Sequence, residues 1–232
     1  MSWALALIAV LLVALAIWEL VLCEGAHLGP RVVIPLYDLT AQRYDSIKHF
    51  DWEWEGRFLG EPLQAITGEL LDPLILDVGA GTGRTARALA RGLGFSGQMI
   101  CLEPSRRMLA LGRRCAAVPW TSWLRGLAAP LPFAADAFDV VVMLELLEFT
   151  PSASESLQEL QRVLRPGSWM LISNRVGRHG RWIRGRMRSP QAFARLLGEL
   201  GWLDVETYPW QVEYDLVWAR KPWRDEARPG GS

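Results

Sequence analysis

The sequence predicts an α/β fold, with a doubly wound, mostly parallel sheet that is preceded by one transmembrane helix. Three observations support this prediction: short apolar runs alternate with amphipathic segments over residues 72–221, a glycine-rich turn follows the first of these runs, and a continuous apolar segment lies near the N-terminus. Strands that alternate with helices pair through crossover connections, so they form a parallel sheet with helices on both faces.

The composition limits the classes of protein to which the chain can belong. Its 232 residues suffice for one domain with a single core and a short appendage. Half of the residues are hydrophobic, which excludes a disordered chain. The 25 basic residues balance 25 acidic ones, which argues against a protein whose whole surface binds polyanions. The three cysteines, Cys23, Cys101 and Cys115, form no CxxC pair and predict neither disulfides nor a metal site.

The N-terminal apolar segment extends from Trp3 to Leu22 and contains one charged residue, Glu19. A helix of about 20 residues spans about 30 Å, the thickness of the hydrocarbon core of a bilayer. We therefore expect residues 1–24 to be a membrane anchor. A cleavable signal peptide is the alternative, although no Lys or Arg precedes the apolar run and no A-x-A site follows it.

Basic residues flank this segment on its C-terminal side alone. Arg31, Arg43 and Lys48 follow it, whereas only the α-amine precedes it. The positive-inside rule then predicts a single-pass membrane protein whose domain lies in the cytoplasm.

Residues 25–71 connect the expected anchor to the domain. They contain Pro30, Pro35 and Pro62 as helix breakers, with the segment YDLTAQRYD and the aromatic-acidic run FDWEWE between them. We interpret them as a linker with one or two short lid helices over the entrance of the domain. At the other end of the chain, residues 222–232 are expected to be a disordered tail.

In the first half of the domain, strands and helices follow one another. LILDV precedes the glycine turn and TARALARGL follows it as a helix, while QMICLEP and SRRMLALGRRC are expected to repeat the pattern. AVPWTSW is interpreted as a third strand, although Pro119 within it makes the strand pattern weak.

In the second half, the apolar run FDVVVML predicts a strand that is buried on both faces. SASESLQELQRVL predicts an amphipathic helix capped by Ser152, and Pro166-Gly167 a turn into the strand SWMLISN. A last helix, SPQAFARLLGEL, is expected to begin after Ser189 and to end before Gly201. The segments WLDVETYPW and VEYDLVWAR complete the expected sheet.

The turn from Asp77 to Gly83 leaves a strand and opens a helix. Its glycines let a ligand approach the backbone closely, and the N-terminus of the helix favours negative charge. Glu103 ends the next strand 22 residues after Gly81, near the offset at which an acid meets ribose hydroxyls in dinucleotide folds. The glycines alone are equally compatible with a plain tight turn, but together with Glu103 they predict a nucleotide-like ligand.

LDVGAGTGR and the pair Glu103-Pro104 resemble the first motifs of class I S-adenosylmethionine-dependent methyltransferases of the type 11-like kind more than the GxGxxG of nicotinamide or flavin enzymes. The later segments LPFAADAFDVVVMLELLEF, LQRVLRPGSWMLIS and SPQAFARLLGELGWLDVE are similar to that family in the same order, over about residues 37–220. The resemblance implies a Rossmann-like class I methyltransferase domain over residues 72–221, with S-adenosylmethionine as its cofactor.

The same resemblance implies roles for individual residues. The glycines of the turn hold the amino acid part of the cofactor, Glu103 binds the ribose hydroxyls, and Leu144 and Glu145 border the methyl group. The complete expected cofactor-binding set is Asp77, Gly79, Ala80, Gly81, Thr82, Gly83, Glu103, Pro104, Leu127, Leu144 and Glu145.

The chain departs from the family at Gly126-Leu127-Ala128, where an acid usually accepts a hydrogen bond from the adenine amine. That hydrogen bond is either lost or supplied by backbone. The departure leaves open a weaker cofactor site or a degenerate domain that does not methylate.

The implied reaction is an in-line displacement at the sulfonium methyl group, for which proximity and alignment supply most of the rate. A general base is needed only where the acceptor must lose a proton. Candidate catalytic residues are Glu145 and Glu148 after the fourth strand, and Tyr44, Asp45 and His49 in the lid. Each has another interpretation: Glu148 as a solvated residue at a helix start, His49 as a surface residue, and Tyr44 as a ring that packs on the cofactor.

The sequence also bears on the methyl acceptor. No N-P-P-Y, D-P-P-Y or Pro-Cys segment follows FDVVVML, so nucleic acid is not the expected substrate. The layout of anchor and domain, and the similarity of YDLTAQRYD to the lid of quinone methyltransferases, favour a small hydrophobic acceptor such as a lipid, a quinone or a thiol. No partner protein is evident.

The alternative is a non-catalytic, cofactor-binding membrane scaffold with a degenerate methyltransferase fold. An open cavity beside Glu145 favours the enzyme, whereas a cavity plugged by Trp52, Trp54 or Phe149 favours the scaffold.

The segment from Arg175 to Arg188, RVGRHGRWIRGRMR, carries six Arg and no acid, with Trp182, Ile183 and Met187 among them. It follows the fifth strand, at the edge of the sheet where ligands bind. We expect it to contact anionic lipid headgroups, at about 1 kcal/mol per basic residue. A solvated loop and a contact with RNA are the alternatives.

Overall fold

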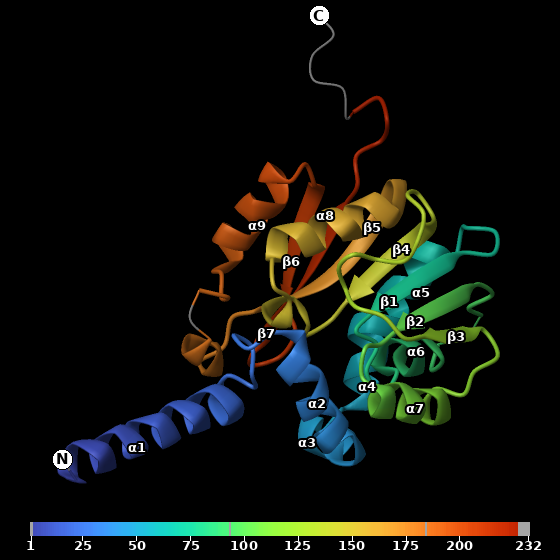
Figure 1. Ribbon diagram of the computed structural model, residues 1–232. Helices are drawn as coiled ribbons and strands as arrows, with labels where there is room; N and C mark the ends of the chain where they lie inside the picture. The colour runs from blue at the N-terminus through green and yellow to red at the C-terminus, as the bar shows by residue number, and fades with distance from the viewer. Residues whose placement is uncertain (1, 93, 184, 227–232) are drawn as a thin grey trace, which may run out of the picture.

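A single seven-stranded sheet forms the centre of the computed structural model, which describes residues 2–92, 94–183 and 185–226 (Figure 1). The strand order is β3-β2-β1-β4-β5-β7-β6. All pairs are parallel except those that β7 makes with β5 and β6. The predicted doubly wound, mostly parallel sheet is therefore confirmed. The strands are β1 (Leu74–Val78), β2 (Gln98–Leu102), β3 (Thr121–Leu124), β4 (Phe138–Met143), β5 (Leu164–Arg175), β6 (Leu203–Pro209) and β7 (Tyr214–Arg220).

Both faces of the sheet are covered, because successive strand residues point into two separate apolar clusters. In β1, Leu76 belongs to the cluster under α8 (Ala153–Val163) and α9 (Pro190–Glu199), whereas Ile75 belongs to the cluster under α5 (Glu61–Thr67) and α6 (Arg84–Leu89). In β4, Val141 belongs to the first of these clusters and Val142 to the second. This double burial explains why all residues of β1 and β4 except Asp77 and Asp139 are apolar.

Side-chain caps fix where three helices begin. Ser105, Ser152 and Ser189 accept hydrogen bonds from the backbone of Met108, Glu155 and Ala192, at the start of α7 (Arg106–Cys115), α8 and α9. The two predicted caps, Ser152 and Ser189, are confirmed. Each cap satisfies a backbone N–H that has no partner within its helix.

Two boundaries in the sheet differ from the predictions. The expected turn at Pro166-Gly167 lies inside β5, where the pairing with β4 shifts register between Phe138 and Val140. Gly167 adopts a φ of +79°, and a Cβ there would lie 2.3 Å from the Trp223 ring, so the irregularity in β5 needs a glycine. The third strand is limited to Thr121–Leu124, after Pro119.

The connecting segment holds more helix than predicted. Pro30 and Pro62 lie in the first turns of α2 (Pro30–Thr40) and α5, where a missing N–H has no cost. The prediction that Pro35 breaks a helix is wrong, because Pro35 lies inside α2. The further helices of this segment are η2 (Ala41–Arg43), α3 (Tyr44–Lys48), α4 (Trp52–Glu55) and η3 (Gly56–Gly60).

The expected tail, residues 222–232, is described as far as residue 226. The described part is a turn, in which the Trp223 N–H donates to Glu226 and Arg220 pairs with the same carboxylate at 2.9 Å. Residues 227–232 lie outside the described residues.

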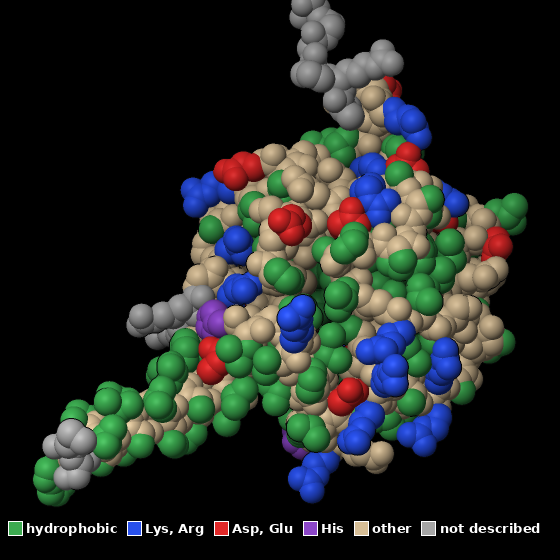
Figure 2. All heavy atoms as spheres, in the orientation of Figure 1, with side chains coloured by type: hydrophobic (Ala, Val, Ile, Leu, Met, Phe, Trp, Pro, Cys, Tyr) green, Lys and Arg blue, Asp and Glu red, His purple; other side chains and the backbone are tan. Residues whose placement is uncertain are grey.

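The apolar N-terminal segment forms α1 (Ser2–Ile17) and continues as a short π-helix, η1 (Trp18–Leu22). It projects away from the domain, and its visible surface is almost entirely apolar up to the end that meets the domain (Figure 2). Trp3–Leu22 has a mean hydropathy of 2.8 and is long enough to cross a membrane. Length and composition alone give this result, and signal sequences share both.

Candidate active site

The carboxyl ends of β1, β2 and β4 border a cleft made of three adjoining pockets that share lining residues. All three pockets share Gly79. Every residue of the expected cofactor-binding set except Gly83 lines one of them. We call the strand ends with residues 77–83 and 103–105 the floor of the cleft, and α2 with α3 its roof.

The three glycines of the turn have positive φ angles but different neighbours. A Cβ at Gly79 would lie 2.6 Å from the Leu146 side chain, and one at Gly83 would lie 2.6 Å from Ala116. At Gly81 the nearest atom would be 3.5 Å away, on Met108. Gly79 and Gly83 are therefore required for packing, whereas Gly81 faces the cleft and leaves room for a ligand.

Glu103 is held by the backbone of the floor. One carboxylate oxygen accepts from the Gly81 N–H at 2.9 Å and the other from the Ser105 N–H at 2.8 Å. Burial raises the pKa of Glu103 to about 7 although these two hydrogen bonds lower it. Because each carboxylate oxygen can accept a second hydrogen bond, Glu103 suits a ligand with two neighbouring hydroxyls.

Asp77 is a buried acid with one unused oxygen. Its Oδ2 has no hydrogen-bond partner among the described residues, and burial raises its pKa to about 7 against a hydrogen bond from Thr85. A buried carboxylate without a full set of partners is costly, so a bound ammonium group would stabilise it. Asp77 and Glu103 thus fit the two ends of the cofactor that the sequence predicts: an amino acid and a ribose.

Side chains tie the roof to the floor. Asp38 of α2 accepts from the Ser105 hydroxyl at 2.5 Å and from the Arg107 N–H at 2.9 Å, at the start of α7. Asp45 of α3 accepts from the Thr82 hydroxyl at 2.6 Å. Both acids belong to YDLTAQRYD, so this segment is bonded to the floor through two side chains.

Glu145 is fully engaged by two cations. Its carboxylate oxygens lie 2.5 Å from Lys48 Nζ and 2.6 Å from Arg84 Nη1, and Arg84 also pairs with Glu55. Burial disfavours the charge on Glu145, but Lys48 and Arg84 outweigh it and lower its pKa. The geometry therefore argues against the expected role of Glu145 as a general base, although Glu145 does line the cleft.

The structure separates the other catalytic candidates. Tyr44 lines the cleft, and burial raises the pKa of its hydroxyl, which favours packing on the cofactor over a role as base. Glu148, in η4 (Leu147–Phe149), is buried and accepts from the Tyr214 hydroxyl at 2.6 Å, so it is neither solvated nor among the residues that line the three pockets. His49 is exposed.

Four charged residues of the site were not predicted from the sequence to belong to it: Lys48, Arg84, Glu55 and Asp38. One local signal was present for Arg84: it is the first residue of α6, where the helix dipole disfavours a positive charge unless an acid pairs with it. The acids that do so, Glu55 and Glu145, are 29 and 61 residues away in the chain. No local pattern points to such distant partners.

The Arg-rich segment lies beside the end of the apolar helix. Its helical turn η5 (His179–Trp182) contacts η1, and the Cys23 thiol donates to the Trp182 carbonyl at 3.1 Å. Arg175 is buried beside Glu24 and Glu148, and Arg186 donates to the carbonyl oxygens of Thr150 and Pro151.

Arg175 and Arg186 have guanidinium groups that are bonded within the protein, so the expected lipid contact of this segment would depend on its other basic residues. Ile183 is also buried, whereas Trp182 is about half exposed and Arg178 is exposed. Residue 184 and the side chain of Arg181 lie outside what the structure describes.

The chain is similar in sequence to known proteins. Residues 76–172 match the profile of a family described as a methyltransferase domain. The chain is 32% identical over 152 residues to a 2-phytyl-1,4-naphtoquinone methyltransferase from Synechococcus elongatus, covering 61% of this chain and 62% of that protein. It is 31% identical over 158 residues to a demethylmenaquinone methyltransferase from Symbiobacterium thermophilum, covering 64% and 61%. The chain thus spans about three fifths of the length of these relatives.

A solved structure shows the same fold. Phosphoethanolamine N-methyltransferase 2 from Haemonchus contortus, in complex with S-adenosyl-L-methionine, matches with a TM-score of 0.65 at 15% identity, over 80% of this chain and 57% of that chain. The class I methyltransferase fold is confirmed by this likeness. The family match assigns residues 76–172, at the centre of the predicted domain, to the methyltransferase profile.

Proposed function

We propose that the chain is a membrane-anchored S-adenosylmethionine-dependent methyltransferase that acts on a small hydrophobic acceptor of the quinone type. The observation that carries this proposal is the position of the roof. α2 begins at Pro30, only a few residues after the apolar helix, and its residues Val33, Ile34 and Tyr37 line the cofactor cleft. A hydrophobic acceptor that leaves a bilayer beside this helix reaches the cleft without crossing much water.

The lining of the cleft suits a flat apolar ring. Tyr37 contacts both Tyr44 and Phe149, with ring centroids 6.0 Å apart in each pair, and all three rings line the pocket that contains Leu144 and Glu145. Aromatic side chains in this arrangement favour aromatic ligands through edge and offset contacts. The two quinone methyltransferases among the relatives support the same class of acceptor.

In this function Asp77 and Glu103 hold the amino acid and ribose ends of the cofactor, and the bound cofactor supplies the methyl group. The ion pairs of Glu145 keep the roof closed over the reacting atoms, which excludes water and aligns the acceptor. The Gly126-Leu127-Ala128 segment lines the apolar end of the cleft, so adenine recognition there rests on backbone and packing.

A non-catalytic scaffold is the second candidate, and the structure favours it less. Phe149 lines the cleft but leaves it open. Trp52 packs under the Arg87 guanidinium at 3.7 Å, and Trp54 donates to the Trp210 carbonyl at 3.1 Å, so neither ring fills the cleft. An open cavity beside Glu145 is the arrangement that favours turnover.

A transfer assay tests the proposed function. Full-length protein in detergent is incubated with methyl-labelled S-adenosylmethionine and a total lipid and quinone extract, and then with reduced naphthoquinones that lack the ring methyl group. We expect label in a quinone-type product and none with Glu103→Ala. Cofactor binding by calorimetry without transfer to any component of the extract would support the scaffold instead.

The membrane part of the proposal has its own test. A chain that begins at Trp18 lacks most of the apolar helix but keeps Trp18, Cys23 and Ala26, which pack against Phe149 and Ile183. We expect carbonate to extract this shortened chain from membranes while the full chain stays in the pellet. If protease reaches the domain only from the non-cytoplasmic side, the proposed cytoplasmic orientation is wrong; if the mature chain starts after residue 20, the segment is a signal peptide.

A further inference from the structure

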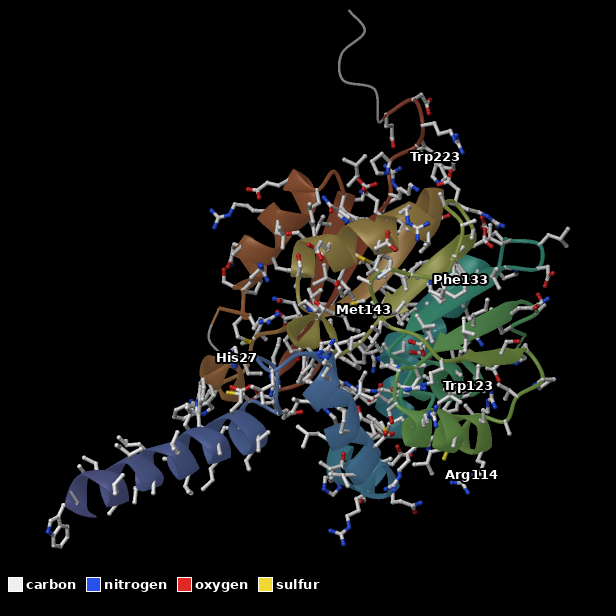
Figure 3. The ribbon with its side chains drawn as sticks, in the orientation of Figure 1. His27, Arg114, Trp123, Phe133, Met143 and Trp223 are labelled. Carbon is white, nitrogen blue, oxygen red and sulfur yellow. The ribbon has the colours of Figure 1, made fainter. Side chains whose placement is uncertain are left out.

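Three side chains that are typical metal ligands meet where the apolar helix joins the domain. Glu19 lies in η1, Cys23 caps its C-terminal end, and His27 lies in the turn before α2. One ligand atom from each residue lies within 4.8 Å of the other two. The position of His27 in Figure 3 marks this cluster, beside the segment that contains η5.

The separations of these atoms are close to those of a tetrahedral site. His27 Nδ1 lies 2.8 Å from Glu19 Oε2, and Cys23 Sγ lies 3.1 Å from the Trp182 carbonyl oxygen. Zinc ligands lie about 2.0 to 2.3 Å from the ion, which places neighbouring ligand atoms about 3.5 Å apart. An ion would fit if these two contacts opened by about half an ångström and the longer separations, which reach at most 4.8 Å, shortened to a similar spacing.

The backbone holds the three residues in this arrangement. The Gly25 N–H donates to the Glu19 carbonyl at 2.8 Å, and the His27 N–H donates to the Glu19 carboxylate at 3.0 Å. The indole of Trp18 stacks on the His27 ring, with 5.5 Å between the centroids and 17° between the planes. Such contacts orient ligand side chains before an ion binds.

Burial and charge also suit a divalent cation. Cys23 is fully buried and Glu19 is 7% exposed, so an ion there would be shielded from water on most sides. A carboxylate and a thiolate together balance two positive charges. Zinc accepts oxygen, sulfur and nitrogen from Glu, Cys and His, whereas magnesium, calcium and manganese prefer oxygen ligands alone.

We propose that Glu19, Cys23 and His27 bind one zinc ion, which fixes the turn between the apolar helix and α2. The Cys23 thiol releases its proton to solvent as the Zn–S bond forms, and the Trp182 carbonyl oxygen or a water molecule completes the tetrahedron. The ion then joins the end of the apolar helix to the roof of the cleft and to the Arg-rich segment. This site does not depend on whether the helix spans a membrane.

Cobalt binding tests the site directly. Full-length protein in detergent, without a histidine tag, is stripped of metal with a chelator and titrated with Co²⁺, because a cobalt–thiolate bond gives a charge-transfer absorption. We expect one equivalent to bind, with the absorption lost and the affinity lowered at least about tenfold in Cys23→Ser and His27→Gln. Zn²⁺ should displace the cobalt, and elemental analysis should find one zinc per chain.

Cys115→Ser is the matched control, since Cys115 is an exposed cysteine in α7 and should leave the cobalt spectrum unchanged. S-adenosylmethionine binding, measured on each variant, shows that loss of metal is not loss of fold. An absorption that persists in Cys23→Ser, or binding of less than a tenth of an equivalent by the wild-type chain, overturns the proposal.

Discussion

The floor and the roof of the cleft are held by different kinds of interaction. The floor consists of strand ends, and its acids Asp77 and Glu103 are bonded to neighbouring backbone and side chains with capacity left for a ligand. The roof is held by ionised side chains, of which Asp38 and Lys48 are examples. The difference suggests that the floor is the rigid part, whereas the roof rests on contacts that can open when a ligand enters.

The largest expected effect is on the floor. Gly81→Val puts a branched side chain at a φ of +55° and into the cleft, so we expect S-adenosylmethionine affinity to fall by more than about 100-fold. Calorimetry on the folded variant measures this. Gly94→Val is the matched control, because Gly94 also has a positive φ but no atom within 4 Å of an added Cβ. Equal affinities for the two variants would contradict the cofactor site.

Removing one positive charge from the roof should loosen the roof without affecting the floor. Lys48→Met leaves Glu145 with Arg84 as its single cation, and we expect a loss of about 1 to 3 kcal/mol in the free energy of unfolding. Hydrogen exchange should become faster in α2 and α3 but stay unchanged in β1 and β2.

The double variant Lys48→Met with Glu145→Gln isolates the pair itself. If the Lys48–Glu145 ion pair stabilises the fold, the losses in the free energy of unfolding of the two single variants should not add up to that of the double variant. Uniformly faster exchange throughout the domain would show that the roof and the floor are one cooperative unit.

The pKa values of the floor acids and of Glu145, which pairs with Lys48 of the roof, should be shifted in opposite directions. Burial raises the pKa of Asp77 and of Glu103 to about 7, whereas Lys48 and Arg84 lower the pKa of Glu145. Between about pH 4 and pH 7, Asp77 and Glu103 therefore hold protons in the folded, ligand-free protein that the unfolded chain has released. The stability that these two protonated acids contribute is fully present below about pH 4 and is lost as the pH rises towards 7. The contribution of Glu145 has the opposite sign and is lost only in acid.

The cofactor binds the ionised forms of the floor acids, so its affinity should rise about tenfold per titrating acid between pH 6 and pH 8. Calorimetry at the two pH values measures this rise, and Glu103→Gln should remove the part that belongs to Glu103. An affinity that is independent of pH in the wild-type protein would show that the floor acids are already ionised at pH 6.

The smallest expected effect is at the junction between the apolar helix and the domain. In the chain that begins at Trp18, Arg178→Gln should weaken binding to anionic vesicles by about 1 kcal/mol, or about fivefold, and added salt should weaken the unsubstituted chain similarly. Arg114→Gln is the control, because Arg114 is exposed on α7, far from the apolar helix (Figure 3). If both variants bind equally weakly, general charge rather than this segment is responsible.

The local features of the molecule were predictable because they depend on neighbours in the chain. A strand followed by Gly79, Gly81 and Gly83 must turn sharply, and the acid at the end of the next parallel strand must come beside that turn. The caps Ser152 and Ser189 act within three residues. The apolar runs of β1 and β4 required burial on both faces. These constraints determined the sheet, the cofactor cleft and the apolar N-terminal helix.

Contacts between distant segments were decided by the tertiary structure alone. Lys48 and Glu145 are 97 residues apart, and Cys23 and Trp182 are 159 apart. Nothing near Glu145 in the sequence indicates that two cations hold its carboxylate, so it read as a candidate base. A side chain's pKa and its role depend on the charges packed around it, and only the folded chain brings those charges together.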